Sequence, residues 1–279
     1  KNMYAMFEGA KMFNQDLNSW DISSVTNFTF MFAVAINFNQ DLNSWDMSNA
    51  TNLESMFNGA SAFNGDITLW KVDKVTRTFN LFKGATAFNQ DISGWNVANV
   101  TTMNGMFNGA LEFNQNINNW NVSSVSNMNS TFKGAIKFNQ DISNWDVSNV
   151  TQMSNMFQNA ESFNQNISNW NVSKTVLMSQ MFQGATFFNQ NLDNWNISNT
   201  TNMYNMFNDT ALSTDNYDKT LIGWKGLSSL KSNVYFGANN SAFCTSESER
   251  SFLISKGWKI TDAGKDCSNS TLSLDEVLE

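Results

Sequence analysis

The chain has 279 residues, of which 41% are apolar and only 14% are charged. Its net charge of −8 argues against a nucleic-acid partner and against docking on anionic lipid, because both need a basic surface. The absence of His removes the usual general base and the commonest metal ligand. No stretch reaches the roughly 18 to 20 apolar residues that a membrane-spanning helix needs.

A gapless repeat of 25 residues fills most of the chain. Trp returns at every 25th position from Trp20 to Trp195, and Phe stands thirteen and seven residues before each of them. Asn follows the second Phe in every copy, from Asn14 to Asn189. Such a period is typical of proteins whose units bury their apolar faces on one another. We predict that residues 1–210 form this stack, as eight full units and part of a ninth.

Two spacings predict the secondary structure of a unit. Between Met153 and Ala160, apolar residues fall at i, i+3, i+4 and i+7, the spacing of one helix face, and Thr151 stands at the N-cap position. Trp145-x-Val147 has the alternation of a strand. Each unit is therefore expected to be a short strand, a corner, a short helix and a return loop, with Trp and Phe side chains stacked in a shared interior.

The repeat carries a family resemblance. The run FNQDISNWDVSNVT, residues 138–151, resembles the repeat of the BspA-like leucine-rich-repeat surface proteins, and the likeness extends from residue 1 to about residue 210. The segment from Tyr217 to Cys267 resembles the terminal module of such proteins from Bacteroidetes-like bacteria. This resemblance implies a right-handed α/β solenoid of the leucine-rich-repeat type at a bacterial cell surface, or secreted, with a role in adhesion. It implies no particular ligand.

The repeat decays after Phe207, and we predict that residues 211–267 form a capping module. The only two cysteines, Cys244 and Cys267, bracket this module and are expected to form a disulfide in an oxidising compartment. No His or further Cys could complete a metal or catalytic site around them. Residues 268–279, first Ser-rich and then acidic, are expected to be a linker or tail.

The residues that flank each Trp are the main candidates for ligand binding, because they face outward in this arrangement. The row directly after Trp consists of Asp21, Asp46, Lys71, Asn96, Asn121, Asp146, Asn171 and Asn196. The row directly before Trp consists of Ser19, Ser44, Leu69, Gly94, Asn119, Asn144, Asn169 and Asn194. In one unit Lys74 and Arg77 join Lys71 as a basic spot, which is either sequence drift or a determinant of specificity. A polar face short of aromatic residues favours a protein ligand from a host, a matrix or a neighbouring cell over a glycan. The other interpretation is an inert solvated surface.

Three further rows carry alternative hypotheses. The Asn that follows the second Phe is expected to be structural. An acidic row four residues before Trp is a weak calcium candidate, although turns favour the same residues. Its members are Asp16, Asp41, Asp66 and Asp91, and later units change to Asn. A Thr ladder six residues after Trp either caps helices or orders water as in ice-binding proteins.

The function expected from these rows is binding. No carboxylate pair is unique to one unit, so we predict no enzyme activity and no cofactor. We expect an extracellular binding or adhesion module, with an ice-binding segment as the alternative.

Overall fold

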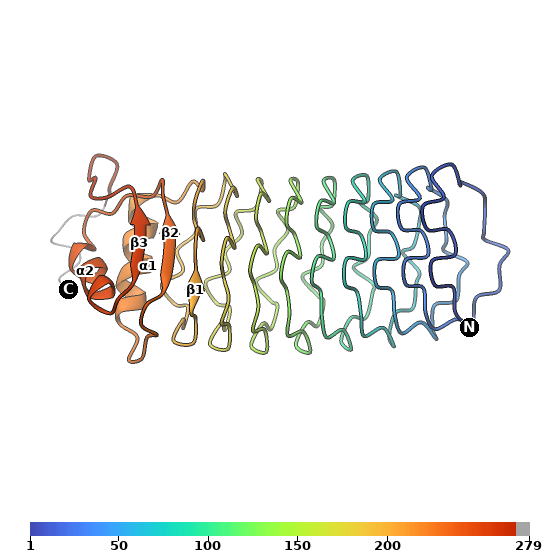
Figure 1. The fold of residues 1–279 in the computed structure, drawn as a ribbon, viewed down its shortest axis with the longest axis horizontal. Helices are drawn as coiled ribbons and strands as arrows, with labels where there is room; N and C mark the ends of the chain where they lie inside the picture. Colours follow the sequence, from blue (N-terminus) through green and yellow to red (C-terminus); the bar gives the residue numbers. More distant parts are fainter. Residues whose placement is uncertain (272–279) are drawn as a thin grey trace.

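The computed structural model describes residues 1–271, in which 25-residue units stack side by side along the long axis (Figure 1). Isolated parallel β-bridges join equivalent residues of successive units, from Asn2 with Asn27 to Leu177 with Asn202. The N-terminus lies at one end of the stack and both helices lie at the other (Figure 1). Most of the predicted tail, residues 272–279, lies outside the described residues.

The regular elements of residues 1–271 are few and lie near the C-terminal end. They are β1 (Asn202–Met203), α1 (Thr214–Lys225), β2 (Tyr235–Ala238), α2 (Glu247–Ser255) and β3 (Lys259–Asp262). The three strands are parallel and form an open sheet in the order β1-β2-β3. Asn202 pairs with Tyr235, and Tyr235 pairs with Lys259, so this sheet continues the row of bridges that joins the repeats.

The short helix predicted within each unit is wrong, because residues 151–160 form a run of turns. Asn155 and Asn159 have φ values of 59° and 56°, and residues in this left-handed conformation interrupt an α-helix. The N–H of Phe157 donates instead to the carbonyl oxygen of Met181 in the next unit, at 2.8 Å. The N–H groups of Met156 and Gln158 close turns, because each donates to the carbonyl oxygen of the third residue before it. Turns therefore produce the apolar spacing that resembles a helix face.

The predicted strand is also misplaced. Trp145 and Val147 are buried and Asp146 between them is exposed, as the alternation predicts. However, the N–H groups of Trp145 and Val150 donate to the third residue before each, at 3.1 and 2.9 Å, and so close turns within the unit. No strand covers residues 142–150. The bridge to the neighbouring units lies instead at Gln152.

Aromatic side chains of successive units stack in one shared interior. The ring centroids of Phe107 and Phe132 lie 5.6 Å apart with planes 4° from parallel, and Phe132 lies 3.9 Å from Phe138 of its own unit. The indole Nε1 of Trp145 donates to the carbonyl oxygen of Ile117 in the preceding unit, at 3.0 Å. Every repeat Trp from position 45 to 195 makes the equivalent bond. The interior is thus apolar, and its indole donors are satisfied.

Helix α1 continues the stack, although it departs from the 25-residue period. Nε1 of Trp224 in α1 donates to the carbonyl oxygen of Leu192 at 3.0 Å, which is the bond that the repeat Trp residues make. The ring of Trp224 lies 6.5 Å from that of Phe207. A helical segment therefore covers the last aromatic layer, which would otherwise be an exposed apolar patch.

A buried carboxylate joins the two helices of the C-terminal region. Asp218 of α1 is fully buried and accepts the backbone N–H groups of Cys244, Thr245 and Ser246 at 2.9–3.1 Å. Ser246 is the N-cap residue of α2, so the carboxylate also lies at the positive end of that helix. The predicted disulfide between Cys244 and Cys267 is present in the same region. Asp218 stands outside the 25-residue repeat, so its burial does not follow from the repeat pattern.

Candidate functional site

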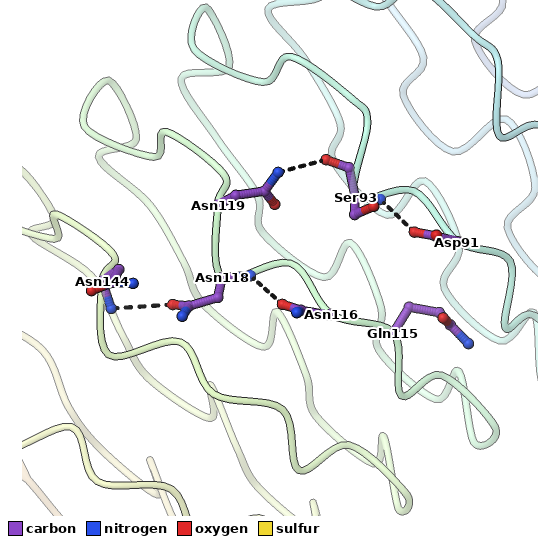
Figure 2. A pocket seen from close by; sticks show the side chains of 7 residues that line it. All are labelled: Asp91, Ser93, Gln115, Asn116, Asn118, Asn119 and Asn144. Carbon is purple, nitrogen blue, oxygen red and sulfur yellow. Dashed lines mark hydrogen bonds between the residues drawn. The ribbon is translucent and has the colours of Figure 1, made fainter.

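A polar groove lies beside the residues that come just before Trp in the sequence, and it occurs twice along the stack. One copy has a volume of about 540 Å³ and is shown in Figure 2. A second copy, of about 420 Å³, lies two units further along. The first is lined by Asp91, Ser93, Gln115, Asn116, Asn118, Asn119 and Asn144. The second is lined by the equivalent positions Asp141, Ser143, Gln165, Asn166, Ser168 and Asn169.

Short-range turns and bonds between units hold the groove side chains in place. Oδ1 of Asn116 accepts the N–H of Asn118 at 3.0 Å, the local turn that Asn and Asp favour (Figure 2). The amide of Asn119 donates to the carbonyl oxygen of Ser93 at 3.0 Å, and Oδ1 of Asn118 accepts the N–H of Asn144 at 3.2 Å. Each unit therefore fixes groove side chains of its neighbour in defined positions.

Each of the two grooves carries one carboxylate, Asp91 in the first and Asp141 in the second. The side-chain hydroxyl and the backbone N–H of Ser93 hydrogen-bond to Asp91 and lower the pKa of that carboxyl. The backbone and side chain of Ser143 lower the pKa of Asp141 in the same way. Both carboxylates are ionised at neutral pH and offer acceptors, while the amides of Gln and Asn offer donors and acceptors. Such a surface suits a ligand that carries hydroxyl or amide groups.

The predicted row after each Trp lies outside this groove. Its Asp and Asn members are exposed, and each of them accepts the N–H of the residue two positions on, as Asp21 does from Ser23 at 3.1 Å. The side chain of Asn96 additionally donates to Asp73 at 2.7 Å. The row before each Trp, by contrast, supplies groove residues such as Asn119. Gln115 was missed by the sequence reasoning, although a Gln recurs at this position in most units.

Two of the three bases in the basic spot lie near one acceptor each. Nζ of Lys74 donates to Oδ1 of Asn49 at 2.8 Å, and Nη1 of Arg77 lies 3.9 Å from Oε2 of Glu54. Lys71 is exposed. Arg77 lies in the row of bridges that joins neighbouring units, whereas Lys71 directly follows Trp70.

The acidic row that was a weak calcium candidate makes turn contacts. Oδ1 of Asp16 accepts the N–H of Asn18 at 2.8 Å, and Asp66 accepts that of Thr68 at 3.0 Å. Asp41 accepts the N–H of Asp66 in the next unit at 2.8 Å. Among residues 1–271, no group of three or more His, Cys, Asp or Glu side chains could hold a metal ion.

Two polar ladders run through the repeats. Oδ1 of Asn139 accepts the N–H of Asn164 at 2.9 Å, and this bond recurs from Asn14 to Asn189, as expected of a structural row. In the Thr ladder, the hydroxyl of Thr151 donates to the carbonyl oxygen of Ser126 in the preceding unit, at 3.2 Å. Thr151 does not cap a helix, because the unit contains none.

The repeat region matches a family described as "Mycoplasma protein of unknown function, DUF285", in three overlapping segments: residues 1–93, 65–148 and 112–224. The chain belongs to this DUF285 family. The matches begin with the first repeat and continue through helix α1. This member of the DUF285 family is a repeat protein whose described residues form few helices and an open sheet. No curated protein matches the chain. None of the helices within residues 1–271 is long and apolar enough to cross a membrane.

Proposed function

We propose that this DUF285 chain is a bacterial cell-surface or secreted binding module, which acts in adhesion and presents its polar repeat surface to a ligand. The observation that carries the proposal is the polar groove that recurs two units apart, with the same residue types at equivalent positions. A repeated site gives an extended ligand several equivalent contacts, and linked contacts raise affinity. The disulfide supports an oxidising location.

We also propose that the stack is a right-handed solenoid related to the BspA-like leucine-rich-repeat proteins. The resemblance of residues 138–151 to that repeat and the parallel bridges between units support this relation. We propose no catalytic activity, since the two grooves repeat the same polar residue types and give no carboxylate pair a special environment.

The groove can be tested by filling it. Leu69 stands in the row before Trp and is 69% exposed, so this position accepts a large apolar side chain without burying it. The double variant Asn119→Leu, Asn169→Leu should therefore fold and block both grooves. We expect it to lose binding to host, matrix and glycan ligands that a screen of the wild type identifies.

A matched control lies on the other side of Trp. The double variant Asn121→Lys, Asn171→Lys changes the row after Trp to the residue found at Lys71. If this variant alone loses binding, the ligand uses the row after Trp instead of the groove. If neither variant changes binding, or if the wild type binds nothing, the proposed polar binding surface is rejected.

A second candidate is an ice-binding segment. It is favoured by the hydroxyls of the Thr ladder, which recur at the same position in each unit from Thr26 to Thr151 and belong to exposed residues as far as Ser126. Val176 interrupts the ladder, and each hydroxyl proton is donated to a main-chain carbonyl. An assay of ice recrystallisation tests this candidate: inhibition by the wild type that Thr101→Asn and Thr76→Asn abolish would support it, and its absence rejects it.

A further inference from the structure

A second kind of pocket lies on the face where the parallel bridges join the units. Its volume is about 310 Å³, and its lining consists of Glu54, Arg77, Phe79, Thr101 and Thr102, from three successive units. Unlike the polar grooves, it combines a base, an acid, two hydroxyl residues and an aromatic ring. The next unit has Thr102 and Asn104 where this unit has Arg77 and Phe79, so the pocket is not repeated there.

Arg77 keeps most of its hydrogen-bonding capacity for a ligand. Its side chain is 64% exposed, and its Nη1 lies 3.9 Å from Oε2 of Glu54, too far for a hydrogen bond. The guanidinium donates no hydrogen bond to any other side chain or carbonyl within residues 1–271. A free guanidinium fork binds a carboxylate through two parallel hydrogen bonds.

Phe79 and Glu54 define the rest of the ligand. The ring of Phe79 is half-buried at the pocket, where it offers an apolar surface beside the guanidinium. The carboxylate of Glu54, whose side chain is 27% exposed, accepts hydrogen bonds and repels a second anion placed directly on it. A fitting ligand therefore carries one carboxylate for Arg77, hydroxyl donors for Glu54 and a C–H face for Phe79.

We propose that this pocket binds a sugar acid unit of an acidic polysaccharide. A uronate supplies a ring carboxylate, hydroxyl donors and a C–H face within one residue. This proposal rests on the proposed binding function, and it names the ligand class for one unit of the stack.

An acidic peptide fits this pocket less well. The backbone here is already paired: the carbonyl oxygen of Arg77 accepts the N–H of Leu53 at 3.1 Å, and the N–H of Thr101 donates to the carbonyl oxygen of Thr76 at 3.1 Å. The position lies inside the row of bridges and gives a peptide strand no free edge to join. An Asp or Glu side chain would also bring no donor to Glu54.

The test is calorimetric titration of the chain with trigalacturonate at low salt. The fully methyl-esterified trimer, which lacks the carboxylates, and hexaglutamate serve as comparison ligands. Arg77→Thr and Phe79→Asn introduce the residues of the next unit at these positions and should leave the fold intact. Lys83→Asn is the control for charge, since Lys83 is an exposed base outside the pocket and Asn108 stands at its position in the next unit.

We expect the wild type to bind trigalacturonate and the esterified trimer to bind at least tenfold more weakly. Arg77→Thr should weaken trigalacturonate binding about 10- to 100-fold, as expected for the loss of a charge-assisted pair. Phe79→Asn should weaken both sugars, and Lys83→Asn should change neither by more than about twofold.

Three results would overturn the proposal: no binding of trigalacturonate, equal loss in Arg77→Thr and Lys83→Asn, or tighter binding of hexaglutamate that depends on Arg77. The third result would assign the pocket to an acidic peptide instead. If the groove-filling variants abolish binding of another ligand while trigalacturonate does not bind, this inference fails and the proposed function stands. If no ligand binds in either experiment, both fail.

Discussion

Replacement of Trp145 by Ala removes one indole from the middle of the aromatic stack and should be severely destabilising. The side chain is 3% exposed, its ring lies 6.0 Å from that of Phe132, and its Nε1 donates to Ile117 at 3.0 Å. Truncation of a buried aromatic residue to Ala costs about 3–5 kcal/mol. The carbonyl oxygen that loses its buried donor adds roughly 1–3 kcal/mol. We therefore expect a loss of about 4–8 kcal/mol in the free energy of unfolding.

The two contributions can be separated. Trp145→Phe keeps an aromatic ring and removes the indole donor, so it should cost about 1–3 kcal/mol, close to the hydrogen-bond contribution alone. Asp146→Asn changes the exposed neighbour to the residue found at Asn121 and should stay within about 0.5 kcal/mol of the wild type. Urea unfolding followed by far-ultraviolet circular dichroism measures all three variants. A loss below about 1 kcal/mol for Trp145→Ala would refute the reasoning.

Three further predictions concern the C-terminal region and the exposed turns. Arg250→Ala leaves the nearly buried carboxylate of Asp262 without its ion pair and should lower the free energy of unfolding by about 3–5 kcal/mol, as measured by thermal or urea unfolding. A loss below about 1 kcal/mol, which is typical of an exposed pair, would contradict this expectation. Reduction of the disulfide should cost about 3 kcal/mol by the loop-entropy model, and an unchanged unfolding midpoint under reducing conditions would count against it. Ser23→Ala removes the side-chain hydrogen bond that chiefly lowers the pKa of Asp21, so NMR titration should show this pKa rising, and an unchanged pKa in the variant would refute the assignment. Because a lowered pKa stabilises the fold above the unfolded-state pKa, the wild type loses that contribution as the pH falls through the folded-state pKa.

The stacking of the units could be predicted from the sequence, but the backbone of a unit could not. The burial of Met153, Met156, Phe157 and Ala160 follows from their spacing, and all four are buried. The same spacing is compatible with a helix and with a series of three-residue turns, and left-handed residues such as Asn155 decide between the two. The apolar pattern does not show which residues other than Gly adopt a positive φ, so it could not exclude the helix.

The candidate sites divide in a similar way. The disulfide could be predicted, since the chain has only two cysteines, and the Asn row could be recognised as structural from its regularity. The row before Trp, which supplies Asn119 and Asn169 to the grooves, was a candidate from the sequence, but the recess beside it could not be predicted from the residue pattern. The pocket at Arg77 required Glu54 and Thr102 from neighbouring units, and their proximity follows only once the register of the bridges is known.

The most direct test of the account is a crystal structure of the repeat region. It should place the rings of Phe107 and Phe132 within about 6 Å of each other and nearly parallel, with Nε1 of Trp145 on the carbonyl oxygen of Ile117. It should also leave the grooves beside Asn119 and Asn169 open to solvent. Aromatic side chains of successive units that lie apart or point into solvent would contradict the shared interior, and with it the placement of every polar site outside it.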